Sequence, residues 1–345
     1  MHGENRPDGT AKVLNVGFDA EHPPHTGTTG HEPDERKHPM SENIIEAPKR
    51  RGPLFVIAAV VVAALVVTGF LIFGGGDSDA KGKTIKIGVV GAGDPYWDTY
   101  KKAAAAEGIN IKLVNFTDYA QPNPALAEGE LDINQFQHLV FLADYNVSNK
   151  KSLTPIGATA IYPLGLYSKK YDSTDQIKTG DTVAVPSDVS NQARGLLILQ
   201  SKGLIKLKDG GTIFSDLSDI DTGASKVKVK ALDAALTASS LDDLAAAVVN
   251  NDFVEKAGLK FSDAIAQDDP SDPTALPYVN VFAVRPEDKD NKTYQKLVRI
   301  FQTDKAVIDG LIKVSGNTAV PARTPVGELV ASLKKVEADT AANKK

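Results

Sequence analysis

The sequence contains no cysteine, and only two methionines and one tryptophan, in a chain of 345 residues. Without cysteine there is no disulfide bond, no thiolate nucleophile, no cysteine ligand for a metal ion and no lipid attached through a cysteine. Positive charge is not in surplus either, because the formal net charge is -5. Since binding to nucleic acid depends on lysine and arginine that neutralise phosphates, nucleic acid is not expected as a partner.

Histidine is scarce outside the first 47 residues, which hold five of the six and leave His138 alone in the remainder. Residues 1–52 are rich in His, Pro, Gly, Thr and acidic side chains and lack apolar periodicity, so a disordered cytoplasmic tail is predicted there. The stretch HPPHTGTTGH is either a weak metal-binding tract or a solvated segment. The second interpretation is favoured because nothing imposes a fixed coordination geometry.

One long apolar run without charge begins at Pro53 and ends at Phe73. At about 1.5 Å per residue, residues 53–73 span roughly 30 Å as a helix, the thickness of a bilayer core, and a transmembrane anchor is predicted. Lys49, Arg50 and Arg51 precede it, so the positive-inside rule places the N-terminus in the cytoplasm and the remainder outside the cell membrane. A cleaved signal peptide is the alternative, but the run exceeds a usual signal-peptide core and no A-x-A site follows directly.

Residues 74–83 resemble a linker, and residues 84–345 show the alternation of strands and helices that is typical of α/β proteins. Short apolar or alternating runs predict strands at residues 84–91, 109–116, 131–136, 154–169, 181–186 and 278–285. Helical patterns predict helices at residues 94–107, 123–128, 191–202, 241–254 and 291–303, with a further helical stretch at the end.

About 260 residues of α/β pattern exceed what one core of this kind needs, so two lobes are predicted. Lobe 1 would comprise about 84–165 plus 279–345, and lobe 2 about 166–278. The chain would cross between the lobes near residues 156–168 and 277–285. A ligand would lie in the cleft between the lobes, where the carboxyl ends of strands converge.

Four segments, read together, resemble the methionine-binding lipoproteins, also called the NlpA or MetQ family. They are FTDYAQPNPALAEGELDINQFQHLVFL (116–142), IYPLGLYSKK (161–170), VAVPSDVSNQARGLLILQSKGLIKLKDG (183–210) and PYVNVFAVR (277–285). The resemblance implies a two-lobed, type II periplasmic-binding-protein fold that closes on L-methionine and presents it to an ABC permease with its ATPase. It implies neither an enzyme nor a cofactor. The family normally carries a lipobox cysteine, which is missing here, so residues 53–73 would provide the anchor instead.

The resemblance and the residues together predict eight ligand-binding positions, and their chemistry suits a buried amino acid. They are Tyr119, Phe136, His138, Phe141, Asn191, Arg194, Asn250 and Asn280. A buried zwitterion needs a cation for its carboxylate, acceptors for its ammonium group and an apolar slot for its side chain. The guanidinium of Arg194 would bind the carboxylate through two parallel hydrogen bonds. From the residues alone, an exposed helix arginine is the alternative.

The three asparagines each have a structural alternative. Asn191 is either the N-cap of the helix that follows, a ligand contact, or both. The side-chain oxygens of Asn250 and Asn280 would accept hydrogen bonds from an ammonium group. The alternatives are a turn residue for Asn250 and a hydrogen bond that bridges the lobes for Asn280.

His138 and the aromatic residues would form the wall around a thioether, because sulfur interacts favourably with aromatic edges. The period of two along a strand places Phe136 and His138 on one side. Taken alone, a single histidine on an apolar segment is more often a structural residue, and only the resemblance favours a ligand contact for His138. The family commonly has a tyrosine where this chain has Phe141, so another apolar amino acid or a methionine-containing dipeptide stays an alternative ligand.

Two other classes of function are weighed against a binding protein. An enzyme would use His138 as a general base oriented by Asp118 or Asp132, but the chain has no G-x-S-x-G, no metal-ligand pattern and no phosphate-binding loop. An adhesive ectodomain would not need clustered arginine, asparagine and aromatic side chains. A shift in thermal stability with free amino acids would separate a binding protein from an adhesin.

Overall fold

The computed structural model describes residues 83–343. The predicted tail, the predicted anchor at residues 53–73 and most of the predicted linker lie outside this range. Within residues 83–343, no helix has the length and apolar character needed to cross a membrane.

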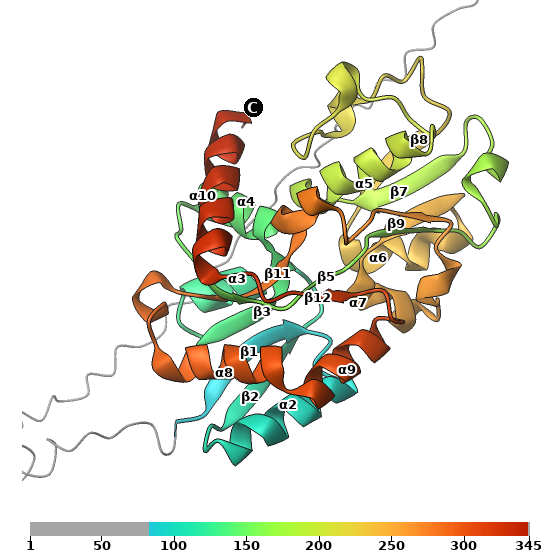
Figure 1. Ribbon diagram of the computed structural model, residues 1–345. Coiled ribbons are helices and arrows are strands. Elements are labelled where there is room, and N and C mark those ends of the chain that lie inside the picture. Colours follow the sequence, from blue (N-terminus) through green and yellow to red (C-terminus); the bar gives the residue numbers. More distant parts are fainter. Residues whose placement is uncertain (1–82, 344–345) are drawn as a thin grey trace, which may run out of the picture. The chain divides into compact units, whose positions relative to one another are not determined.

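The first of two five-stranded sheets has the order β2-β1-β3-β11-β4. Its strands are β1 (Ile85–Val90), β2 (Ile111–Phe116), β3 (Ile133–His138), β4 (Thr154–Ala158) and β11 (Asn280–Val284). β1 pairs in parallel with β2 and β3, whereas β11 is antiparallel to β3 and β4. Figure 1 shows β11, the last of these strands in the sequence, inside a sheet otherwise formed by the beginning of the described chain.

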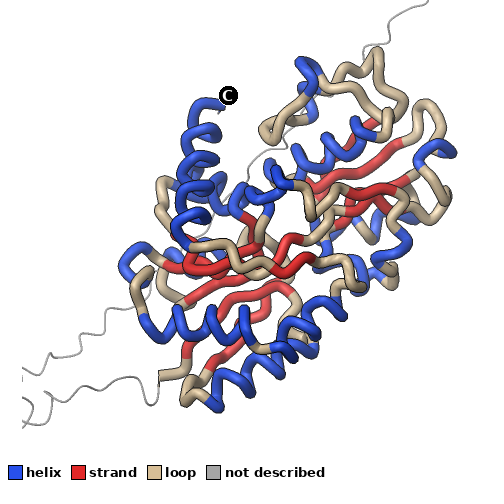
Figure 2. The backbone as a smooth tube through the Cα atoms, viewed as in Figure 1, coloured by secondary structure: helices blue, strands red, loops and turns tan. Residues whose placement is uncertain are grey.

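Helices cover both faces of this first sheet (Figure 2). One face carries α2 (Pro95–Ala106), α8 (Lys292–Thr303) and α9 (Lys305–Val314), and the other carries α3 (Pro122–Ala127), α4 (Leu139–Asn149) and α10 (Val326–Asn343). Successive side chains of a strand point to opposite faces of the sheet. In β11, Phe282 packs into the core on one face, whereas Val281 and Ala283 pack into the core on the other.

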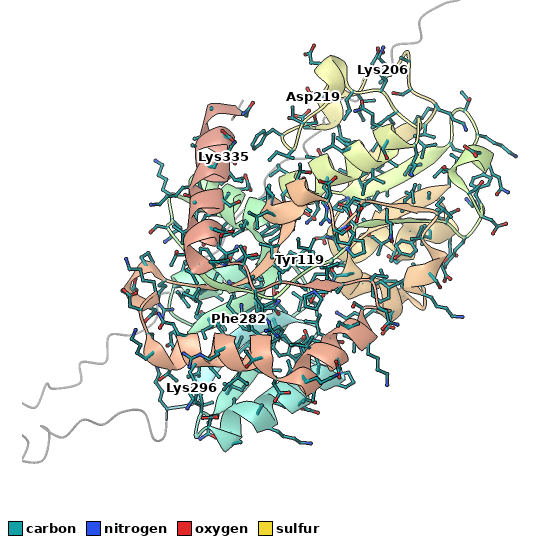
Figure 3. The ribbon with its side chains drawn as sticks, in the orientation of Figure 1. Tyr119, Lys206, Asp219, Phe282, Lys296 and Lys335 are labelled. Atoms are coloured by element: carbon teal, nitrogen blue, oxygen red, sulfur yellow. The ribbon has the colours of Figure 1, made fainter. Side chains whose placement is uncertain are left out.

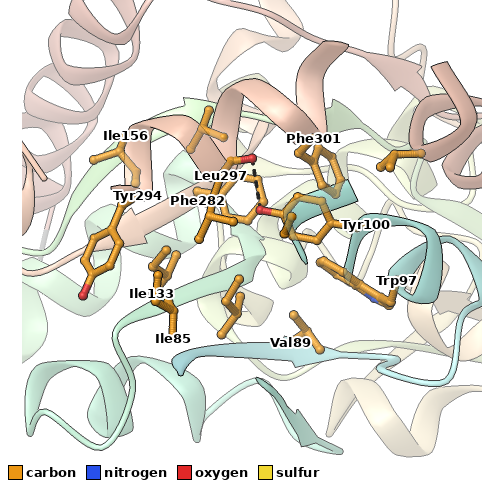
Figure 4. Packing of buried hydrophobic residues seen from close by; sticks show 14 of the residues in the cluster. Ile85, Val89, Trp97, Tyr100, Ile133, Ile156, Phe282, Tyr294, Leu297 and Phe301 are labelled. Atoms are coloured by element: carbon orange, nitrogen blue, oxygen red, sulfur yellow. Dashed lines mark hydrogen bonds between the residues drawn. The ribbon is translucent and has the colours of Figure 1, made fainter. Parts of the chain in front are cut away.

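The core beneath α2 and α8 is rich in aromatic side chains (Figure 4). Trp97, Tyr100, Phe282 and Phe301 are buried together with ring centroids 5.1–6.3 Å apart. The hydroxyl of Tyr100 donates to the backbone oxygen of Leu297 at 3.1 Å, which satisfies the polar atom of an otherwise buried ring. This packing fixes the sheet whose strand ends carry half of the candidate site.

The second sheet has the order β10-β6-β9-β7-β8. Its strands are β6 (Gly165–Tyr167), β7 (Thr182–Pro186), β8 (Lys228–Leu232), β9 (Ala246–Val249) and β10 (Ala266–Gln267). Helix α5 (Val189–Ser201) packs on one face, and α6 (Ala234–Thr237) and α7 (Asn251–Val254) lie on the other side. A small ribbon pairs β5 (Ala160–Ile161) with β12 (Val320–Pro321).

Short 3-10 helices occupy several connections. They are η1 (Thr174–Gln176), η2 (Lys208–Gly210), η3 (Leu217–Asp219), η4 (Ser239–Asp242), η5 (Glu255–Ala257), η6 (Phe261–Asp263), η7 (Pro273–Tyr278) and η8 (Pro286–Asp288).

The chain passes between the two sheets twice, at residues 162–164 and 268–279. The Asp268 carboxylate accepts a hydrogen bond from the Leu164 backbone N–H at 2.8 Å and so ties the two crossing segments together. The return crossing overlaps the predicted stretch 277–285 only at residues 277–279, because most of that stretch is the interior strand β11 of the first sheet.

The predicted helix at residues 241–254 is wrong. Its beginning is η4, its middle is the strand β9 and its end is the short helix α7. All four residues of β9 are buried, and the strand lies between β6 and β7. A continuous apolar run in a central strand has no alternation that would distinguish it from a buried helix.

Other elements also differ from the sequence prediction. The single strand expected at 154–169 is three short strands, β4, β5 and β6, because the chain crosses between the sheets within it. The edge strand β8 was not predicted, and its residues are exposed or half-buried, which leaves only a weak hydrophobic pattern.

Candidate functional site

All eight residues predicted for ligand binding line one pocket between the two halves of residues 83–343. The free volume of this pocket is small, about 20 Å³. Figure 3 shows Tyr119 between the elements of the two sheets. The other lining residues are Gln137, Tyr162, Pro163, Leu164 and Asn251.

His138 ends β3 and caps the helix that follows. Its Nδ1 accepts a hydrogen bond from the backbone N–H of Phe141 at 3.1 Å. Its Nε2 therefore carries the proton and donates to Oδ1 of Asn191, 3.2 Å away in the second half of the molecule. Burial, together with the positive charge of Arg194, lowers the pKa of His138 to about 3. His138 is thus a neutral ring with both nitrogens engaged, which removes the general base required by the enzyme alternative.

Asn191 is not the N-cap of its helix, contrary to one of its predicted roles. The cap is Asp188, whose Oδ1 accepts from the backbone N–H and the side-chain Nδ2 of Asn191, both at 2.9 Å. Ser190 Oγ donates to the same oxygen at 2.9 Å. Burial raises the pKa of Asp188. The cap residue therefore orients Asn191, which in turn orients His138.

Arg194 is buried, not exposed, and already has partners within the protein. Its Nε donates to Asp268 Oδ2 at 2.5 Å, and its Nη2 donates to the backbone oxygen of Tyr162 at 2.8 Å. The guanidinium carbon lies 4.4 Å from the centre of the Tyr278 ring. An arginine has five N–H donors, so these two hydrogen bonds leave Nη1 and part of Nη2 for an anion in the pocket.

Asn250 and Asn280 bring amide groups to the pocket from opposite halves. Asn250 follows β9, and its Oδ1 is buried without a hydrogen-bond partner among the described residues. Such an atom is costly unless something else donates to it. Asn280 begins β11 opposite His138. Within residues 83–343, its side chain makes no hydrogen bond between the halves, so the bridging alternative for Asn280 is wrong.

Tyr162 lines the pocket beside the predicted aromatic wall, and two further rings pack against that wall from behind. Tyr119, Phe136 and Phe141 have ring centroids 5.6–6.1 Å apart. Phe253 adds a ring 5.2 Å from that of Tyr119, and Tyr278 adds one 5.3 Å from that of His138. Phe253 lies on α7, inside the segment wrongly predicted as one helix, and Tyr278 lies at the end of η7 in the return crossing. For this reason the sequence did not identify either ring as part of the site.

A cluster of buried amides behind the wall was also not recognised. Asn123 of α3 exchanges two hydrogen bonds of 2.6 Å with Gln137 and accepts one of 2.8 Å from Asn134. The signal was present in β3, because INQFQH carries several polar side chains and all six residues are buried. The cluster fixes α3, and with it the preceding turn that holds Tyr119, against the strand that holds Phe136.

Residues 83–343 contain no group of three or more His, Cys, Asp or Glu that could hold a metal ion. The pocket instead combines one cation, amide oxygens and aromatic rings. This is the set of groups that a zwitterion with an apolar side chain requires.

Comparison with known proteins identifies the family. The family model described as NlpA lipoprotein matches residues 85–322. The chain belongs to the NlpA lipoprotein family. The D-methionine-binding lipoprotein MetQ of Salmonella typhi is similar to it, with 38% identity over 271 residues that cover 77% of this chain and 96% of the relative.

Solved structures of this family have the same fold. A nutrient-binding protein from Burkholderia cenocepacia, solved bound to methionine, is 37% identical with a TM-score of 0.65, and the match covers 69% of this chain and 100% of that one. A Staphylococcus aureus protein gives a TM-score of 0.70 at 34% identity, covering 73% of this chain and 100% of its own. Residues 83–343 therefore have the two-lobed α/β fold of substrate-binding proteins, and this NlpA family member is a binding protein, not an enzyme.

Proposed function

We propose that this NlpA family member captures L-methionine outside the cell and delivers it to an ABC permease with its ATPase. Lobe 1, about 84–165 plus 279–345, and lobe 2, about 166–278, close on the ligand. Residues 53–73 hold the protein at the cell membrane in place of the lipid of its lipoprotein relatives.

The observation that carries this proposal is the arrangement of unsatisfied groups in one pocket. Arg194 uses only Nε and Nη2 for hydrogen bonds within the described residues, so its other N–H groups can bind a ligand. The buried Oδ1 of Asn250 has no partner among the described residues. A free amino acid satisfies both, with its carboxylate at Arg194 and its ammonium group at Asn250. Asn280 provides a second acceptor from the opposite lobe.

The aromatic wall accounts for the side chain of the ligand. Tyr119, Phe136, Phe141 and the neutral ring of His138 present edges and faces to the pocket, and a thioether sulfur gains roughly 0.3–1.5 kcal/mol from each such contact. Methionine has about nine non-hydrogen atoms, so at up to about -1.5 kcal/mol per atom even submicromolar binding is within reach.

Calorimetric titration tests the proposal directly. The full chain is denatured and refolded to remove carried-over ligand, and then titrated with L-methionine, D-methionine, leucine and glycyl-methionine. We expect one-to-one binding of L-methionine. Binding of leucine or of the dipeptide alone would keep the binding role but reject methionine as the ligand, and no binding of any amino acid or dipeptide would reject the role itself.

Two derivatives of the ligand serve as matched controls for the polar contacts. L-Methionine amide lacks the carboxylate assigned to Arg194, and N-acetyl-methionine lacks the ammonium group assigned to Asn250. Each should bind at least tenfold more weakly than L-methionine, because a hydrogen bond to a charged group contributes roughly 1.5–3 kcal/mol. Equal binding of either derivative would reject the corresponding assignment.

A further inference from the structure

Asp252 lies outside the set of ligand-binding positions and yet contacts one of them. The hydroxyl of Tyr119, in the turn between β2 and α3, donates to Oδ2 of Asp252 at 2.6 Å. Tyr119 belongs to the half built on the first sheet, whereas Asp252 lies on α7 beside the second sheet. The distance is that of a hydrogen bond from a hydroxyl to a charged carboxylate, which is stronger than one between neutral groups.

Helix α7 combines this contact with two others. Asn250 immediately precedes the helix and lines the pocket. Phe253, the next residue after Asp252, places its ring 5.2 Å from that of Tyr119. Residues 250–253 therefore contact Tyr119 through the ring of Phe253 and the carboxylate of Asp252, and they place the amide of Asn250 in the pocket.

We propose that Asp252 is a positioning residue that latches the closed lobes by holding the hydroxyl of Tyr119 across the cleft. The proposal rests on the ligand binding proposed above and explains how the ligand is retained. The hydrogen bond from Arg194 to the backbone oxygen of Tyr162 is less suited to this role. Tyr162 lies in a crossing segment, where lobe movement changes distances least. His138 and Asn191 also join the lobes, through a neutral hydrogen bond of 3.2 Å.

The surroundings of Asp252 make the hydrogen bond from Tyr119 important. Burial raises the pKa of this carboxyl group to about 6, so it is ionised at neutral pH. Tyr119 and Asn251 donate to it, Lys256 lies near enough to lower its pKa, and Asp94 opposes that effect. Removing the hydroxyl of Tyr119 would leave a half-buried carboxylate with one donor fewer in the closed state.

The test is a double-mutant cycle on the full chain at pH 7.5, with L-methionine affinity and dissociation rate as readouts. Tyr119→Phe keeps the ring and should raise the dissociation rate and the dissociation constant about tenfold or more. In an Asp252→Ala background, the same substitution should change both by less than about twofold, because the acceptor is already absent. Asp252→Asn keeps an acceptor oxygen and should bind more tightly than Asp252→Ala.

A purely structural role for the pair would give a different pattern. The latch forms only when the lobes close, so Tyr119→Phe should leave the melting temperature of the ligand-free protein unchanged while it accelerates dissociation. If Tyr119→Phe has the same effect in the unmodified protein and in Asp252→Ala, the proposed latch is wrong, whereas the proposed methionine binding still stands. Failure of the unmodified protein to bind methionine or any other amino acid or dipeptide would overturn the proposed function and the latch with it.

Discussion

Arg194 is the residue on which the carboxylate assignment depends. It connects the ligand pocket to the crossing segments through Asp268 and Tyr162. We expect Arg194→Ala to weaken L-methionine binding at least 100-fold, since two hydrogen bonds to a charged group contribute roughly 3 kcal/mol or more. Arg194→Lys should restore little, because a point charge cannot serve Asp268, Tyr162 and a carboxylate in fixed directions. Calorimetric titration measures both variants.

The matched control is Arg299→Ala, which removes an exposed arginine of α8 on the first sheet. It should leave the affinity unchanged. Circular dichroism separates a loss of binding from a loss of fold in Arg194→Ala, in which Asp268 loses its cation. Normal methionine binding by a folded Arg194→Ala would show that the carboxylate lies elsewhere.

His138 should make the free energy of unfolding decrease as the pH falls. In the unfolded chain its imidazole takes up a proton near pH 6.5, whereas in the folded protein its pKa is about 3. The unfolded state binds more protons between these values, so the free energy of unfolding falls as the pH falls below 6.5, by up to about 1.4 kcal/mol per pH unit. Asp252 contributes with the opposite sign below pH 6, because its pKa is raised on folding to about 6.

The contribution of His138 is therefore measured as a difference. Urea unfolding of the unmodified protein and of His138→Gln is compared at pH 7.5, 6 and 5. The stability of the unmodified protein should decline more steeply with falling pH than that of the variant, since all other titrating groups are shared. Parallel pH profiles would mean that the imidazole titrates in the folded protein as it does in the unfolded chain, and that Arg194 and burial do not hold it neutral.

At the scale of secondary structure, the N-terminus of α5 organises the pocket. Asp188 accepts three hydrogen bonds there and fixes Asn191, which contacts His138 in the other lobe. Asp188→Ala should lower the free energy of unfolding by about 0.5–2 kcal/mol, the usual cost of removing an N-cap. It should also weaken methionine binding several-fold, because Asn191 loses its orientation. Urea unfolding and calorimetry measure the two effects.

Asp304→Ala is the control for this element. Asp304 caps α9 on the first sheet, where it accepts from the backbone N–H groups of Ala306 and Val307. Its removal should destabilise the protein by a similar amount without changing methionine affinity. If the two cap variants lose affinity equally, stability alone accounts for the effect of Asp188.

Helices and strands with a clear local pattern were predictable from the sequence, and long-range partners were not. The strand at 84–91 and the helix at 94–107 agree with β1 and α2, because apolar spacing and the proline at the helix start are local signals. All eight predicted site residues also meet in one pocket. However, Asp268 lies 74 positions from Arg194, and Asp252 lies 133 positions from Tyr119. No local pattern connects such pairs, so only the folded chain identifies the partners.

At the scale of the whole binding domain, the proposed mechanism requires the two lobes to move relative to each other. Both sheets have their own buried cores, and within residues 83–343 only the segments 162–164 and 268–279 connect them along the chain. The two crossing segments, joined by the hydrogen bond from Leu164 to Asp268, can act as a hinge between the lobes. The pocket lies between the lobes, so ligand entry and ligand retention need different separations of the lobes.

The absence of cysteine makes this movement measurable, because introduced cysteines are the only sites that a thiol-reactive dye can label. Lys102 on α2 and Lys178 before β7 are exposed and belong to different lobes. With both replaced by cysteine and labelled as a donor and acceptor pair, L-methionine should shift the transfer efficiency, and Tyr119→Phe should reduce the shift at a fixed methionine concentration below saturation.

Replacement of Lys102 and Lys112 by cysteine provides the control pair, since both positions are exposed and lie in the same lobe. Its transfer efficiency should stay constant with methionine. A ligand-dependent change in both pairs would indicate an effect on the dyes and not on the lobes. Binding by calorimetry without a change in either pair would mean that the pocket fills without closure, and the latch between Tyr119 and Asp252 would then have no movement to restrain.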